Sequence, residues 1–168
     1  SDGTPETFHF PVPTQKVEHV IVNLCPTEPW ALPNWVILRH KTTAFLSVLK
    51  EIKNSHFSSA RFYIAINEKE DRTVADAKNF ACNEDWMSVF PLYAKYPQDD
   101  PVILTKVILG MDVHFGQDTE SLGVLILDAQ TVSSIYESCI LRKNVNSRFI
   151  VLSGTGLKEN EILNVQLG

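Results

Sequence analysis

The chain has 168 residues, a formal net charge of −5 and a pI near 5.5. This length fits one domain of ordinary size, and 44% hydrophobic with 21% charged residues is typical of a globular protein. The acidic balance argues against nonspecific nucleic-acid binding, because gripping a phosphate backbone requires clustered lysine and arginine. No apolar stretch reaches the roughly 18 residues of a membrane span, so we expect no membrane partner.

The three cysteines, Cys25, Cys82 and Cys139, are odd in number, far apart and without a C-x-x-C pair. This spacing favours a reducing compartment over a disulfide framework or a zinc site. The chain begins at Ser1 rather than at a methionine, which suggests a fragment of a larger protein.

Hydrophobic periodicity predicts strands over Lys16 to Leu24 and over Trp35 to Leu38, joined by a proline-rich turn. A helix should run from Thr42 or Thr43 to about Asn54, because apolar residues recur there at helical spacing after a capping threonine. The alternating segment from Arg61 to Asn67 predicts the next strand.

Three more helices are expected: Asp71 to Phe80, one capped by Asn83, and one that begins at Asp100-Pro101. Strands should then cover Gly123 to Leu127, Ser138 to Leu141 and Phe149 to Leu152, followed by a tight turn at Gly154-Thr155-Gly156.

Helices grouped between two runs of strands predict an α+β fold, in which a mainly antiparallel β-sheet packs against a cluster of about four helices. We expect one domain over residues 1–168, with the helical cluster at about residues 42–112. The residues expected to be buried are Phe45, Leu49, Ile52, Ile64, Ile66, Val107 and Phe149.

No catalytic or metal-binding signature is recognisable. The five histidines have no metal-ligand spacing, and the Gly154 to Lys158 segment lacks the glycines and the setting of a phosphate loop. The carboxylates at Glu68 to Asp71 and at Asp99-Asp100 fit solvated helix starts better than a cation site. We therefore expect no catalytic residue, no metal and no cofactor, and an independent metal-dependent nuclease is the least favoured function.

Aromatic residues offer the main binding hypothesis, since exposed flat rings near strand ends can stack on a nucleobase. The simpler alternative is that most of these rings fill a core. The chain begins with Phe8-His9-Phe10, and later come a helix with Thr43-Ala44-Phe45-Leu46, a strand Phe62 to Ile66, and Asn83-Glu84-Asp85-Trp86-Met87. This order of segments resembles the cap-binding domain of the orthomyxovirus polymerase basic protein 2. It is similar to an influenza-like domain from the thogotovirus branch.

The resemblance implies a non-catalytic module of a viral RNA-dependent RNA polymerase that holds the 7-methylguanosine cap during cap-snatching. Phe8, Phe10 and Trp30 are the candidates for stacking on the base. The candidates for contacting or supporting its edge are Asn34, Glu28, Lys50, Phe80 and Tyr93. Asn34 stands where the family has an acid, so we expect a pocket that binds cap weakly or not at all.

Two functions stay open on this resemblance: a module that binds a cap or a related purine, and a purely structural domain of the polymerase heterotrimer. The expected partners are the other polymerase subunits and capped RNA. The expected locations are the host nucleus and the virion.

Overall fold

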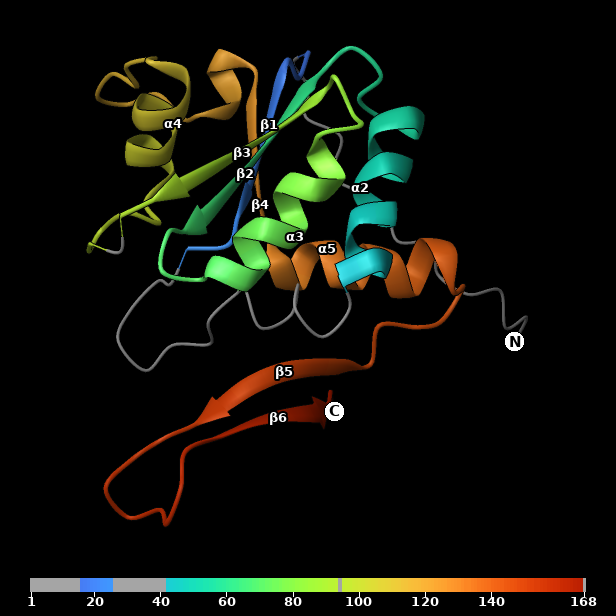
Figure 1. Ribbon diagram of the computed structural model, residues 1–168, viewed down its shortest axis with the longest axis vertical. Helices are drawn as coiled ribbons and strands as arrows, with labels where there is room; N and C mark the ends of the chain where they lie inside the picture. The colour runs from blue at the N-terminus through green and yellow to red at the C-terminus, as the bar shows by residue number, and fades with distance from the viewer. Residues whose placement is uncertain (1–15, 26–41, 94, 168) are drawn as a thin grey trace.

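The computed structural model describes residues 16–25, 42–93 and 95–167 (Figure 1). Within them the chain forms, in order, β1 (His19–Asn23), α2 (Thr42–Ser55), β2 (Arg61–Asn67), α3 (Asp71–Ala81), β3 (Met87–Leu92), α4 (Pro101–Leu109), a 3-10 turn η1 (Glu120–Leu122), β4 (Val124–Asp128), α5 (Ala129–Ile135), a π-helical turn η2 (Tyr136–Ile140), β5 (Ser147–Leu152) and β6 (Glu161–Gln166).

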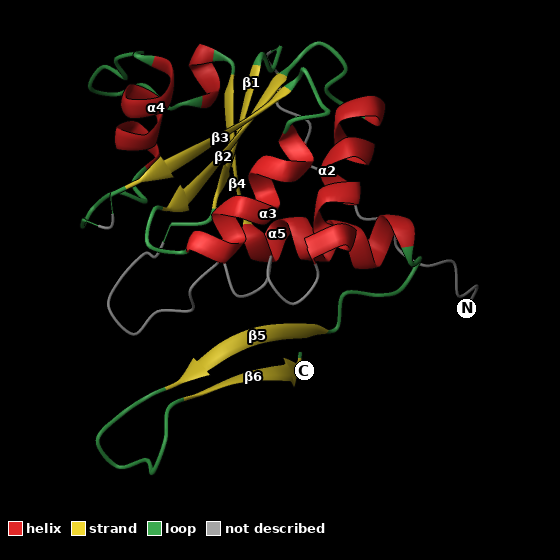
Figure 2. Cartoon of the chain, viewed as in Figure 1, coloured by secondary structure: helices red, strands yellow, loops and turns green. Residues whose placement is uncertain are grey.

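Four strands form a fully parallel sheet in the order β3-β2-β1-β4. His19 at the start of β1 lies opposite Arg61 of β2 and Val124 of β4. Helices α2, α3 and α5 lie on one face of this sheet, and α4 lies on the other (Figure 2). The body of the protein is therefore built of three layers.

The central position of β1 explains its sequence. Val20, Ile21 and Val22 are fully buried, because a strand inside a parallel sheet is covered on both faces. Val20 and Val22 face the layer of three helices, whereas Ile21 faces α4, where Leu104 is fully buried. A continuous apolar run thus forms β1, and its polar end marks the edge of the sheet.

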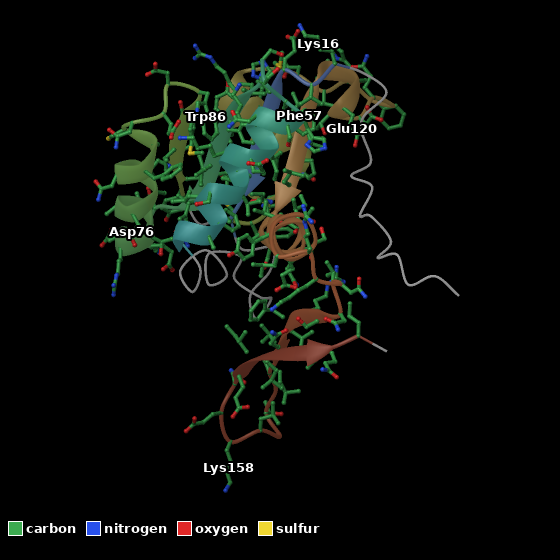
Figure 3. All side chains as sticks on the ribbon, turned by 90° about the vertical axis from the view of Figure 1, so that its right-hand side faces the viewer. Lys16, Phe57, Asp76, Trp86, Glu120 and Lys158 are labelled. Atoms are coloured by element: carbon green, nitrogen blue, oxygen red, sulfur yellow. The ribbon has the colours of Figure 1, made fainter. Side chains whose placement is uncertain are left out.

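Strands β5 and β6 form a separate antiparallel hairpin below the body, with Lys158 near its far tip (Figure 3). Phe149 is half-buried and packs against the helical layer. The side-chain amide of Gln130 in α5 donates to the Phe149 carbonyl at 3.0 Å and accepts from the Phe149 N–H at 3.2 Å. These contacts join the hairpin to the body.

The expected mixture of helices and strands is confirmed, and the described residues contain four α-helices. The expectation of a mainly antiparallel sheet is wrong, since only the hairpin is antiparallel. The cause is the segment after Asn83, which forms a turn and then β3 instead of a capped helix. With β3 in place, strands and helices alternate, and such alternation produces parallel pairing.

A second error lies at Ser138 to Leu141, where the sequence pattern predicts a strand. Asp128 caps α5, and the helix continues into the η2 turn instead. Strand β6 is absent from the expected elements, although the turn at Gly154 does join two strands. The strand expected over residues 35–38 lies outside the described residues.

The other expected elements are found with small shifts at their ends. They are the strand at Lys16 to Leu24, the helix after Thr42, the strand Arg61–Asn67, the helix from Asp71, the helix at Pro101, and the strands near Gly123 and Phe149. Five of the seven expected core residues are buried: Phe45, Leu49, Ile52, Ile64 and Ile66. Val107 is 51% exposed, because α4 turns Leu104 rather than Val107 toward the sheet.

Candidate functional site

The carboxyl-terminal edge of the parallel sheet is the place where this architecture puts functional groups. From β1 the chain moves through β2 to β3 and then returns to β4 on the other side of β1. Ligands of open parallel sheets bind outside the carboxyl ends of the strands, at the point where the strand order reverses. Here this point lies between Asn23 of β1 and Asp128 of β4, which are paired in register.

Asn23 ties the end of β1 to the connection between β3 and α4. Its side-chain nitrogen Nδ2 donates to the Asp99 carbonyl at 3.1 Å, and its Oδ1 accepts from the Cys25 N–H at 3.0 Å. Only 9% of Asn23 is exposed, so these bonds satisfy an amide that burial would otherwise penalise. The end of β1 and the connection between β3 and α4 are therefore held together at this edge of the sheet.

Cys25 follows directly and is 1% exposed, packed with Ile21, Ala65 and Leu104 under α4. Burial, and then the Asp99 carboxylate, raises the pKa of the Cys25 thiol to about 12. The thiol is therefore neutral at physiological pH and is not a nucleophile.

Asp100 occupies the start of α4. Its Oδ1 accepts from the N–H groups of Val102 at 2.9 Å and of Ile103 at 3.1 Å. Pro101 stands at the first helical position, where it has no N–H to satisfy. The carboxylate thus completes the helix start that the sequence predicts.

The other two described helix starts at this edge are also acidic. Asp128 accepts from the Thr131 N–H at 2.6 Å at the start of α5, which is seven residues long. At α3 the capping position is Glu70, and Asp71 lies in the first turn. All three strand-to-helix connections that the structure describes at this edge therefore present carboxylates.

Glycine is missing from these three connections, since none occurs between Gly3 and Gly110 or between Gly123 and Gly154. The later glycines have other structural uses. Gly110 ends α4 at φ 72°, and Gly123 lies at the opposite edge of the sheet at φ 73°. A Cβ at Gly123 would come within 3.0 Å of the Lys16 carbonyl oxygen, so close packing with the segment before β1 requires glycine there.

The connection between β3 and α4 also carries exposed aromatic rings and an unsatisfied amide. Tyr93 is 60% and Tyr96 is 74% exposed. The side-chain nitrogen of Gln98 is buried and has no hydrogen-bond partner among the described residues. Of the three expected base contacts that the structure describes, Lys50, Phe80 and Tyr93, only Tyr93 is found at this edge.

Lys50 and Phe80 do not join this site. Lys50 Nζ lies 2.6 Å from Oε1 of Glu84, whose Oε2 accepts from the Trp86 indole at 2.7 Å. Because Glu84 precedes β3, this cluster lies toward the amino-terminal edge of the sheet. Phe80 is partly buried and packs against the helical layer as a core residue.

The remaining expected contacts, Phe8, Phe10, Glu28, Trp30 and Asn34, lie outside the described residues. The sequence reasoning missed Asn23 and Asp128. Each is a polar residue at the end of a buried apolar strand, which is the signal that could have identified them.

Among the described residues, no group of three or more His, Cys, Asp or Glu side chains is arranged to hold a metal ion. The expected absence of a tight divalent metal site stays a prediction. No helix within the described ranges is long and apolar enough to cross a membrane.

Comparison with known proteins finds similarity to a different family from the one expected. Residues 5–137 match the model of the Nuo51 FMN-binding domain. The C subunit of the sodium-translocating ferredoxin:NAD(+) oxidoreductase complex from Acetobacterium woodii is 24% identical, over 93% of this chain and 35% of its own length. The C subunits of ion-translocating oxidoreductase complexes from Haemophilus influenzae and Yersinia enterocolitica are 23% and 24% identical, over 92% and 94% of this chain. The chain spans about a third or less of the length of these relatives.

These matches overturn the resemblance to a viral cap-binding domain, because the relatives are subunits of bacterial oxidoreductase complexes. The expected role in cap-snatching, the polymerase partners and capped RNA, and the location in host nucleus and virion are wrong on the same finding. The expectation of a non-catalytic polymerase module is likewise wrong, because the relatives are subunits of oxidoreductase complexes. The viral resemblance relied on the order of segments, and a mixed order of strands and helices is shared by unrelated folds.

Proposed function

Since the chain belongs to the Nuo51 FMN-binding domain family, we propose that it works in electron transfer, in the role of the C subunit of an ion-translocating oxidoreductase complex. The observation that carries this proposal is the extent of the matches. The family model covers residues 5–137, and the matches to the three C subunits cover 92% to 94% of the chain.

The fold is compatible with this role. Its parallel sheet of order β3-β2-β1-β4 has a single reversal of strand order, and its carboxyl edge is built from connections fixed to one another through Asn23 and Asp99. Such an edge is a rigid surface on which a cofactor or a neighbouring protein can be positioned.

The partners in this proposal are the other subunits of the ion-translocating complex, and the place of action is the membrane across which that complex moves ions. We also propose that residues 1–168 act as one structural unit, with the β5–β6 hairpin attached through Gln130 and Phe149.

The proposal can be tested by affinity purification of the tagged protein from detergent-solubilised membranes of its own host. We expect the other subunits of the complex to co-elute in fixed proportion, as measured by quantitative mass spectrometry. An unrelated soluble protein with the same tag is the control. Isolation of an intact complex that lacks this chain would overturn the proposal.

Activity gives a second measurement. Deleting the gene should lower ferredoxin-dependent NAD(+) reduction by the membranes, and a plasmid copy should restore it. Unchanged activity with an unchanged set of assembled subunits would also contradict the proposed role.

A further inference from the structure

An FMN site on a parallel sheet has two physical requirements. A phosphate monoester carries about −1.5 to −2 charge at neutral pH, and free backbone N–H groups at a helix N-terminus are well suited to hold it. Glycine in the strand-to-helix connection lets the backbone approach the phosphate closely. Both requirements can be examined at the starts of α3, α4 and α5.

At α4 the N–H groups that would hold a phosphate are already used. Those of Val102 and Ile103 bind the Asp100 carboxylate, and that of Leu104 binds the Asp100 carbonyl. Pro101 has no N–H. A phosphate at this helix start would have to displace a carboxylate and would remain next to Asp99.

At α5 the Asp128 carboxylate takes the corresponding position and binds the Thr131 N–H. At α3 the segment from Glu68 to Arg72 carries three carboxylates against two cations, so its charge remains negative. Neither start offers the positive surroundings that a phosphate dianion requires.

The backbone requirement is not met either, because these three connections contain no glycine. The negative charge at this edge of the sheet also disfavours a bound phosphate. The Asp99 carboxylate, second to burial, disfavours a negative charge on Cys25, and it would oppose a phosphate placed nearby.

We infer that this chain is a flavin-free member of its family, because none of the three helix starts that the structure describes at the carboxyl edge is suited to an FMN phosphate. At these starts, acidic residues occupy the capping position or the first turn of the helix. Arg39 and Lys41, which precede α2, lie outside the described residues, and the experiment includes any contribution they make.

The test is a titration of the purified full-length protein with FMN, followed by calorimetry and by quenching of flavin fluorescence. We expect no saturable binding up to about 1 mM, which is at the weak end of specific affinity. We also expect no change in the melting temperature with FMN, because a ligand that binds only the folded state would raise it. Cooperative unfolding of the same sample verifies that the protein is folded.

Riboflavin is the matched control, because it lacks the phosphate. Saturable binding of FMN at micromolar concentration, or a rise in melting temperature that riboflavin does not reproduce, would overturn the inference. If FMN binds, the double variant Arg39→Gln/Lys41→Gln would show whether these cations hold the phosphate. The result is distinguishable from failure of the proposed function, because co-purification with the complex does not depend on flavin content.

Discussion

At the scale of single residues, several carboxylates accept hydrogen bonds from groups of the protein itself. Asp100 and Asp128 each accept backbone N–H groups at a helix start, and Glu84 accepts from both Lys50 and Trp86. Each of these groups stabilises the fold, and each is therefore engaged rather than free to bind a ligand.

Replacing Asp100 by alanine removes the acceptor for the Val102 and Ile103 N–H groups. Loss of such a cap costs about 0.5–2 kcal/mol, so we expect a decrease of about 1 kcal/mol in the free energy of unfolding, measured with urea. Asp100→Asn is the control, because asparagine caps helices equally well. Equal losses in the two variants would mean that the charge, rather than the cap, stabilises α4.

Glu84 should make stability depend on acidic pH. Hydrogen bonds from Lys50 and then from Trp86 hold the pKa of Glu84 below its ordinary value. A group whose pKa is lowered by folding contributes stability above its unfolded pKa of about 4.3, and that contribution is lost as pH falls through the folded value.

We therefore expect the melting temperature of the wild type to fall more steeply below about pH 4 than that of Glu84→Gln. Glu51→Gln, a change on the exposed side of α2, is the control and should follow the wild type. If the melting temperatures of the wild type and Glu84→Gln changed equally with pH, Glu84 would not have a lowered pKa in the folded protein.

At the scale of elements, the β5–β6 hairpin forms a sheet of its own, apart from the four-stranded sheet of the body. A two-stranded hairpin is marginally stable alone, and this one is held by Phe149 and by the paired bonds of Gln130. On its two strands, Ile150, Leu152 and Ile162 are 38% to 43% exposed.

Gln130→Ala should loosen the hairpin while the sheet stays folded. Each lost hydrogen bond contributes about 0.5–1.5 kcal/mol, so protection of the β5 and β6 amides from hydrogen exchange should fall by roughly ten-fold or more. The amides of β1 should keep their protection. Gln117→Ala, in the exposed segment before η1, provides the control. A uniform loss across β1 and β5 would show instead that Gln130 supports the whole fold.

Much of the local structure follows from the sequence, and the errors have identifiable causes. Strand Arg61–Asn67 and the start of α4 are predictable because alternation and an Asp-Pro cap are local signals. Asn83-Glu84-Asp85 carries the composition of a helix start, but the Glu84 side chain binds Lys50, 34 residues away, and Trp86. A contact at that distance has no local signature.

The same limit applies to the candidate site. Asn23 contacts Asp99 across 76 residues of sequence, and it faces Asp128 only because β1 pairs with β4. When β3 is interpreted as a helix, the parallel order cannot be recognised, and neither can the edge that brings these residues together.

At the scale of the whole molecule, the described residues form a three-layer body whose parallel sheet has acidic helix starts at its carboxyl edge. Within one fold the site can vary while the core is kept, because the core depends on buried apolar residues and the site depends on a few connections. A chemical probe at the carboxyl edge of the sheet would test whether this edge opens locally or only when the whole protein unfolds.

Cys25 is such a probe. In a Cys82→Ser/Cys139→Ser variant it is the one thiol left, and burial beneath α4 together with a pKa of about 12 protects it from alkylation. We expect maleimide to react with Cys25 only through unfolding of the sheet, so the free energy derived from labelling rates should equal that from urea denaturation. Rapid labelling without denaturant would show that α4 detaches locally.

The pH dependence of stability provides a further check on Cys25. Because folding raises its pKa, its contribution to stability is fully present below the unfolded value of about 8.5 and is lost as pH rises toward the folded value. The free energy of unfolding of the wild type should therefore decrease from about pH 8 to about pH 10 by more than that of Cys25→Ala. Comparing differences between the two pH values cancels the cavity left by alanine, since that cost does not depend on pH. An equal decrease in both proteins would mean that the thiol ionises as easily in the folded state as in the unfolded chain, and hence that the edge beneath α4 is open to water.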